Sequence, residues 1–172
     1  MSPEPPAIRP VRPEDVPAVV AMVHELAEFE RAPELCHLTE AQLAAALFPP
    51  VATPALFGHV AADPDTGAPY GFALWFLNFS TWEGRHGVYL EDLYVRPSAR
   101  GTGAGRALLA TLAQVCLDRG YPRLEWWVLH WNPAREFYDA LGATAMDEWI
   151  PYRVEGETLT GLAAYTRTVA KP

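Results

Sequence analysis

Apolar side chains recur every three or four residues in several stretches of this chain, the period of a helix with one buried face. Thr39 and Gln42 form a capping-box pair at the start of one stretch, which ends before Pro49. Gly120 follows another stretch, at the position where helices commonly end. The spacing predicts four helices, over residues 13–30, 39–48, 105–118 and 133–141.

Between these stretches lie shorter runs of β-branched and aromatic residues that are typical of strands. Asp63–Gly67 separates two of the runs and is a strong turn sequence. Seven strands are predicted, over residues 7–11, 56–62, 70–79, 87–95, 123–130, 143–150 and 159–168. The central strands follow one another as hairpins and later ones alternate with helices, so we expect an α/β protein with a mixed, mostly antiparallel sheet.

Length and composition narrow the class of protein. A chain of 172 residues that is 50% apolar predicts a single domain, which we place at 7–172 behind a flexible Pro-rich tail at 1–6. The net charge of −8 disfavours nucleic acid as a partner, because DNA-binding domains carry a basic face. No apolar run approaches the ~18 residues of a membrane span, so no membrane partner is expected.

The N-terminus and the cysteines predict a cytoplasmic location. The first six residues lack the basic and apolar segments of a signal peptide. Cys36 and Cys116 lie far apart in the sequence, which is typical of thiols in a reducing compartment. The histidines have no metal-ligand spacing, so no metal is expected.

A glycine-rich segment at 100–106 joins a predicted strand to a predicted helix. The unpaired N–H groups of a helix N-terminus attract anions, and glycines let a phosphate approach the backbone. Arg100 and Arg106 add cationic donors, so the segment predicts a pyrophosphate site. No Gly-Lys-Ser/Thr sequence is present, which excludes a P-loop, and Arg106 breaks the dinucleotide fingerprint. Taken alone, Gly-x-Gly-x-Gly fits a flexible loop equally well.

Several motifs resemble the GNAT acetyltransferase superfamily. Arg100–Gly105 looks like its coenzyme loop, and Phe137–Ala143 looks like its Phe-Tyr-x-x-x-Gly segment. Three further segments resemble the spermidine/spermine (diamine) branch, and its thialysine-acetylating members most: His24–Glu30, Ser80–Arg85 and Tyr89–Asp92. The resemblance covers roughly residues 8–168. It implies the GNAT fold, with a splayed central pair of strands and about four helices.

The resemblance also implies acetyl-CoA as co-substrate. The pantetheine arm would pair with the backbone of Leu93, Tyr94 and Val95, and the strand near Trp126 would splay away from Glu91 to admit the thioester. The pyrophosphate would rest on the loop formed by Arg100, Gly101, Thr102, Gly103, Ala104, Gly105 and Arg106.

Two residues match the branch's catalytic positions. Glu91 would accept the proton of the amine, directly or through water, and Tyr138 would donate a proton to the leaving thiolate. Alternation along a strand predicts that Glu91 and Asp92 point to opposite faces, so that the second carboxylate serves structure or a distant ammonium. From the residues alone, Phe137 and Tyr138 fit helix-to-sheet packing equally well.

The amine pocket implied by the resemblance contains Phe29, Glu30, Trp82, Glu91 and Asp92. The polyamine enzyme has an acidic residue before Pro-Trp, whereas this chain has Ser80-Thr81-Trp82, as the thialysine relative does. The difference favours a shorter, lysine-like amine over a long polyamine. A protein or peptide acetyltransferase and a non-catalytic acyl-CoA sensor are the alternative functions.

Two further expectations come from the family. Its coenzyme-contacting asparagine lies seven residues before the tyrosine, whereas Asn132 precedes Tyr138 by six. Either a one-residue deletion keeps Asn132 in this role or Trp131 occupies the position. Relatives are usually dimers, so a homodimer is expected.

Overall fold

The computed structural model of the chain describes residues 6–169, and the predicted tail at 1–6 lies almost wholly outside them. The chain divides into two compact units, Met1–Trp127 and Val128–Pro172. Within the described residues, no helix is both long and apolar enough to cross a membrane. The prediction of one domain over 7–172 stays a prediction.

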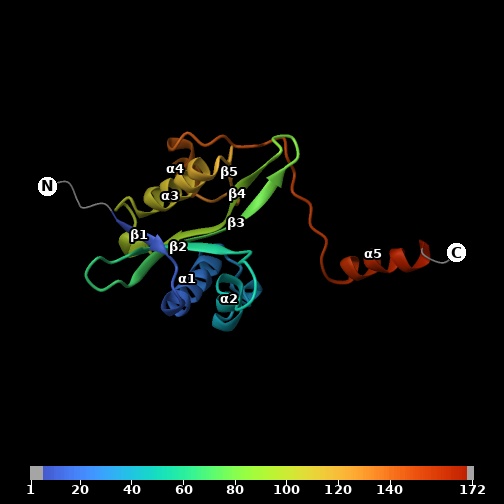
Figure 1. Cartoon of the computed structure of the whole chain (residues 1–172), viewed down its shortest axis with the longest axis horizontal. Helices are drawn as coiled ribbons and strands as arrows, with labels where there is room; N and C mark the ends of the chain where they lie inside the picture. The colour runs from blue at the N-terminus through green and yellow to red at the C-terminus, as the bar shows by residue number, and fades with distance from the viewer. Residues whose placement is uncertain (1–5, 170–172) are drawn as a thin grey trace. The chain divides into compact units, whose positions relative to one another are not determined.

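A five-stranded sheet organises the first unit (Figure 1). The strands lie in chain order, with antiparallel neighbours except for the last pair, which is parallel. They are β1 (Ala7–Pro10), β2 (Phe57–Ala62), β3 (Pro69–Ser80), β4 (Arg85–Val95) and β5 (Leu124–Glu125). The mixed, mostly antiparallel sheet predicted from the sequence is confirmed.

Helices cover both faces of this sheet. On one face, α1 (Val16–Phe29) and α2 (Glu40–Leu47) pack against β2, β3 and the end of β4 around a core that includes Met22, Leu43 and Phe72. On the other face lies α3 (Ala104–Arg119), whose Leu108 and Leu112 are fully buried (Figure 1). The unit is therefore a three-layer sandwich, with the glycine loop at the start of α3.

Local signals place several elements as expected. Thr39 caps α2: its hydroxyl accepts a hydrogen bond from the N–H of Gln42, and the Gln42 side chain accepts one from the N–H of Thr39. Gly120 ends α3 in the left-handed conformation, with φ 66°. The predicted capping box and the predicted helix end are both confirmed.

The second unit corrects the strand predictions for the end of the chain. It contains α4 (Ala134–Ala140), which agrees with the predicted helix, and α5 (Gly156–Val169). The strand predicted at 143–150 is absent, and the one predicted at 159–168 lies inside α5. Leu159, Leu162 and Tyr165 follow one another at intervals of three residues, a helical spacing, and two alanines between them favour a helix.

The strand predicted at 123–130 is reduced to the two residues of β5. Its ladder with β4 joins Val88 to Leu124 and Tyr89 to Glu125, and then stops. A β-bulge in β4 lies at Glu91, between Leu90 and Asp92 and two residues beyond the end of this ladder, and bulges commonly end strand pairing. Because no described strand follows on the outer side of β5, the parallel pair lies at the edge of the sheet instead of its centre.

Candidate functional site

The glycine loop has a backbone conformation that residues with a side chain rarely adopt. Gly101 and Gly103 have φ of 82° and 89°, in the left-handed region where glycine is favoured. Chain neighbours aside, no described atom lies within 4 Å of where a Cβ on either would stand, so the space in front of the loop is open. Among residues 6–169, no side chain caps α3, which leaves the first N–H groups of this 16-residue helix available to an anion. The cradle fits a pyrophosphate.

The edge of β4 fits the amide-rich arm of a coenzyme. Leu93, Tyr94 and Val95 pair with β3 on one side. On the other side, β5 has already ended at Glu125, so no described strand covers this part of the β4 edge. Uncovered strand backbone can hydrogen-bond an extended ligand as an added strand would.

The bulge in β4 decides how the two acidic residues lie. Leu90 pairs with Trp75, and Asp92 pairs with Leu74, so Glu91 is the extra residue on the bulged strand. Directly opposite residues share a face, which places Asp92 on the face of Leu74, toward α1. If the side chains of β4 alternated without a break, Asp92 would lie on the same face as Leu90, toward α3. The bulge interrupts the alternation on which the expectation of opposite faces rested, and that expectation stays a prediction.

Asp92 lies near two other carboxylates. Burial first, and then the negative charges of Glu91 and Glu30, raise its pKa to about 6. Burial also raises the pKa of Glu30, which follows the last residue of α1. Within residues 6–166, no arginine or histidine forms an ion pair with any of the three, and no group of acidic, histidine or cysteine side chains could hold a metal ion. The site has unbalanced negative charge that a cationic ligand would neutralise.

Arg100 joins the glycine loop to the end of α1, a contact that motif spacing does not reveal. Its guanidinium carbon lies 5.3 Å from the centre of the Phe29 ring and 5.7 Å from that of Tyr94. Its Nε donates to the carbonyl oxygen of Val95 at 3.0 Å. Arg100 therefore rests on aromatic rings beside the loop, while Arg106 is exposed within it.

A second contact missed at the sequence level ties α1 to β4. Glu25 accepts hydrogen bonds from Arg96, with an Nη2–Oε1 distance of 3.0 Å and an Nε–Oε1 distance of 3.1 Å. Arg96 directly follows β4, so the pair holds the end of that strand against α1. Glu25 falls in a segment that the family resemblance marks, whereas Arg96 does not, and nothing in their spacing shows that they meet.

Trp82 lies apart from the carboxylates within this chain. It is 90% exposed in the turn between β3 and β4. From Ser80 back to Leu74, which faces Asp92, β3 rises about 20 Å at ~3.3 Å per residue. The structure thus brings together Phe29, Arg100 and Tyr94, and separately Glu30, Glu91 and Asp92, but not Trp82.

Asn132 and Tyr138 belong to the second unit. Asn132 is buried, and its Oδ1 accepts a hydrogen bond from the N–H of Ala134 at 2.9 Å, at the start of α4. Tyr138 lies on α4, with its ring 5.4 Å from that of Phe137. The side-chain oxygen of Asn132 thus has a local structural partner at the start of α4.

Comparisons with known proteins agree with this geometry. Residues 20–143 match the sequence profile described as the acetyltransferase (GNAT) family. The thialysine N-epsilon-acetyltransferase of Bos taurus is 36% identical over 166 residues, covering 91% of this chain and 96% of that protein. The L-ornithine N5-acetyltransferase of Arabidopsis thaliana is 30% identical, covering 90% of this chain and 86% of that protein. Among solved structures, an integron cassette protein of V. cholerae superposes with a TM-score of 0.74 at 29% identity, covering 95% of this chain and 98% of that one.

Proposed function

Because this chain belongs to the acetyltransferase (GNAT) family, we propose that it moves an acetyl group from acetyl-CoA to the terminal primary amine of a lysine-like or ornithine-like molecule or a small diamine. Acetyl transfer to an amine is the activity that the names of the thialysine and ornithine relatives describe. The finer assignment, to a short cationic amine, rests on the chain's own residues.

The observation that carries this assignment is the group of three carboxylates that form no ion pair within residues 6–166. Glu30, Glu91 and Asp92 lie close enough that the first two raise the pKa of the third. A substrate that brings one or two ammonium groups removes this repulsion. A neutral or anionic acceptor would leave the repulsion in place, so the site discriminates by charge.

The loop and the β4 edge would hold the co-substrate. Backbone N–H groups of Gly101 to Arg106 would bind the pyrophosphate, with Arg106 as an exposed cation nearby. Leu93 to Val95 would pair with the pantetheine arm. When bound, acetyl-CoA supplies the thioester whose carbonyl carbon the amine attacks. Asn132, or Trp131 in its place, is proposed as a further coenzyme contact.

The three acidic residues have two roles in this proposal. Asp92 and Glu30 bind the ammonium group that does not react, and Phe29 lines the same end of α1. Glu91, exposed at the bulge, accepts the proton of the attacking amine directly or through a water molecule. Tyr138 donates its hydroxyl proton to the departing sulfur, because a phenol carries an O–H donor. Trp82 is exposed and would contact only a longer or larger acceptor.

The test is steady-state kinetics followed by release of free thiol. Thialysine, ornithine, spermidine and a lysine peptide are compared as acceptors, and we expect the first two to give the highest kcat/KM. Glu91→Gln and Tyr138→Phe should each lower kcat about 100-fold or more. Glu83→Gln, an exposed carboxylate in the β3–β4 turn, is the matched control and should leave kcat unchanged.

Two outcomes would replace this proposal. Turnover of the peptide without turnover of the small amines would identify a protein acetyltransferase. Tight binding of CoA with no acetylated amine in any assay would identify a sensor. Full activity of both Glu91→Gln and Tyr138→Phe would overturn the roles assigned to these residues.

We also propose the compartment in which the enzyme works and its oligomeric state. Cys36 and Cys116 are free thiols, which supports a reducing, cytoplasmic compartment. A homodimer is proposed from the family resemblance. The exposed apolar side chains near the C-terminus support it.

A further inference from the structure

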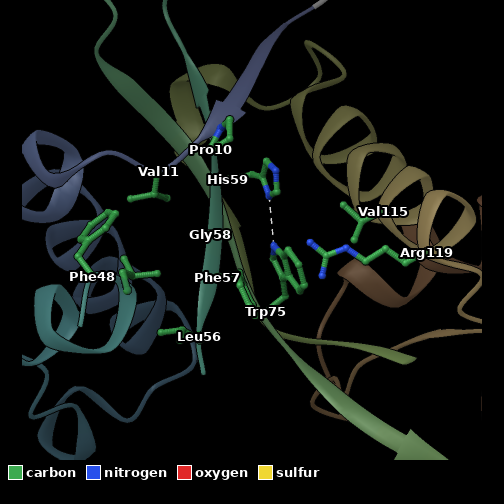
Figure 2. Close-up of a pocket in the computed structure, with 11 residues that line it drawn as sticks. Pro10, Val11, Phe48, Leu56, Phe57, Gly58, His59, Trp75, Val115 and Arg119 are labelled. Atoms are coloured by element: carbon green, nitrogen blue, oxygen red, sulfur yellow. Dashed lines mark hydrogen bonds between the residues drawn. The ribbon is translucent and has the colours of Figure 1, made fainter. Parts of the chain in front are cut away.

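A hollow of about 290 Å³ lies at the edge of β2, beside the end of α2 and the last turns of α3 (Figure 2). Arg119 is the last residue of α3, whereas the glycine loop precedes its first. The helix has 16 residues and is about 24 Å long at ~1.5 Å per residue. The hollow is therefore separate from the coenzyme loop, and nothing in the proposed reaction uses it.

The hollow exists because β1 stops before β2 does. The last β1–β2 pair joins Pro10 to His59, and the N–H of Val11 then donates to the carbonyl oxygen of Gly58 at 2.9 Å. A Cβ on Gly58 would lie 2.6 Å from a methyl carbon of Val11, so this residue has to be glycine and contributes no side chain. The edge of β2 is left open, and apolar side chains from both faces of the sheet border it, among them Phe48, Leu56 and Val115.

One wall of the hollow presents a histidine in a defined tautomer. The Trp75 indole Nε1–H donates to Nδ1 of His59 at 3.1 Å, and Figure 2 shows this bond. Burial lowers the pKa of His59, so its ring is neutral and carries its proton on Nε2. Within the described residues, no acceptor hydrogen-bonds to this Nε2–H group.

The same wall carries a cation without a carboxylate partner. The Arg119 guanidinium carbon lies 5.8 Å from the centre of the Trp75 ring, and the residue is exposed. Five other arginines pair with acidic side chains, whereas Arg119 forms no ion pair with a carboxylate of residues 6–166. An arginine placed over an aromatic ring keeps its N–H donors free for a planar anion.

We propose that this hollow binds a small organic carboxylate with an aromatic or branched apolar body. The carboxylate would accept hydrogen bonds from Arg119 and from Nε2–H of His59. The apolar body would lie along the open edge of β2 against Phe48 and Leu56. The hollow lies at the small end of the usual volumes of ligand pockets, about 300–1,000 Å³, so the ligand is a small molecule instead of a peptide. The unpaired guanidinium excludes a cationic ligand, so the acceptor amine does not compete for this site.

The probe is 3-phenylpropionate, titrated calorimetrically into the full-length protein saturated with CoA, which blocks the coenzyme loop. We expect saturable binding of one molecule per chain. Arg119→Gln should weaken it about tenfold or more, because a hydrogen bond to a charged group is lost. Phe48→Ala should weaken it through lost apolar contact. Arg85→Gln, an exposed arginine without an ion pair in the β3–β4 hairpin, is the matched control and should bind as the wild type does.

Three results would overturn the proposal. They are the absence of saturable binding, equal binding of the neutral 3-phenylpropanamide, and unchanged affinity in Arg119→Gln. Retained CoA binding shows that each variant is folded. Amine acetylation is measured in a separate assay. A failure to bind the carboxylate would therefore leave the proposed function untouched, and a failure to acetylate amines would leave the carboxylate site untouched.

Discussion

At the scale of single residues, Asp92 has the most strongly perturbed environment of the site. It is partly buried on the α1 face, with Glu30 and Glu91 as its charged neighbours. A carboxylate in such a place costs stability in the free protein and gains a favourable interaction only when a cation binds. Function and stability therefore act in opposite directions at this residue.

We predict that Asp92→Asn stabilises the free protein at neutral pH. The pKa of this carboxyl is raised from 3.8 to about 6 in the folded state. The folded state thus holds the proton more tightly, and wild-type stability falls as the pH rises from about 4 to 6. The variant lacks this fall and should be more stable at pH 7 by about 1–3 kcal/mol. Urea unfolding at pH 4 and pH 7 measures the difference, and parallel pH dependence of the two proteins would refute it.

The same carboxyl predicts that kcat/KM falls on the acidic side of its pH profile. If ionised Asp92 binds an ammonium group, kcat/KM for the amine should fall below a pH of about 6, where the carboxyl is protonated. Asp92→Asn should lower kcat/KM near neutrality and remove this limb. The measurement is a pH profile with an acceptor that has two ammonium groups. A limb that persists in the variant would assign the titration to another group.

At the scale of elements, the stability of a short helix depends on the residues that cap its ends. The eight-residue helix α2 contributes Leu43 and Leu47 to the core, yet a helix of this length is marginal by itself. Its capping box stabilises the helix through hydrogen bonds between neighbouring residues, independently of tertiary packing. The sequence predicts this helix well because the signal, Thr39 with Gln42, is local.

We predict that Thr39→Ala lowers the free energy of unfolding by about 1 kcal/mol, because the N–H of Gln42 loses its acceptor. Thr39→Ser keeps the hydroxyl and should lose less than half of that amount. Urea denaturation midpoints at equal slope measure both variants. Equal stabilities of the alanine and serine variants would show that the cap contributes nothing.

One element was predicted wrongly because its sequence pattern fits both a strand and a helix. Residues 159–168 contain β-branched threonines that favour a strand and a three-residue apolar spacing that favours a helix. In the structure the helix forms, although every side chain of 151–166 is exposed. The two-residue length of β5 was equally hidden from the sequence, because it depends on a bulge in another strand.

At the scale of the whole molecule, the apolar surface near the C-terminus is large for a chain acting alone. Eight large hydrophobic side chains between residues 146 and 165 are at least 45% exposed; they are Met146, Trp149, Ile150, Tyr152, Val154, Leu159, Leu162 and Tyr165. Monomeric proteins seldom present so many apolar groups to water in one segment, and such surfaces are typical of interfaces.

We predict that the protein is a dimer of about twice 19.0 kDa in sedimentation equilibrium. The double variant Trp149→Glu with Leu162→Glu should shift the mass toward the monomer, because it puts charges into the proposed interface. Leu117→Glu changes an exposed leucine of α3 and is the matched control. A monomeric wild type at 100 µM, roughly the upper range of such measurements, would refute the prediction.

The sequence by itself determined the features whose causes are local or shared with relatives. These are the start of α2, the end of α3, the glycine loop before α3, the acidic pair in β4 and the GNAT family. The tertiary structure decided where those residues lie. Pairing with β3 puts a bulge at Glu91 and turns Asp92 toward α1, and α1 brings Glu30 to it. Register and helix packing depend on residues far apart in the chain, and a single sequence does not encode those pairings in any local pattern.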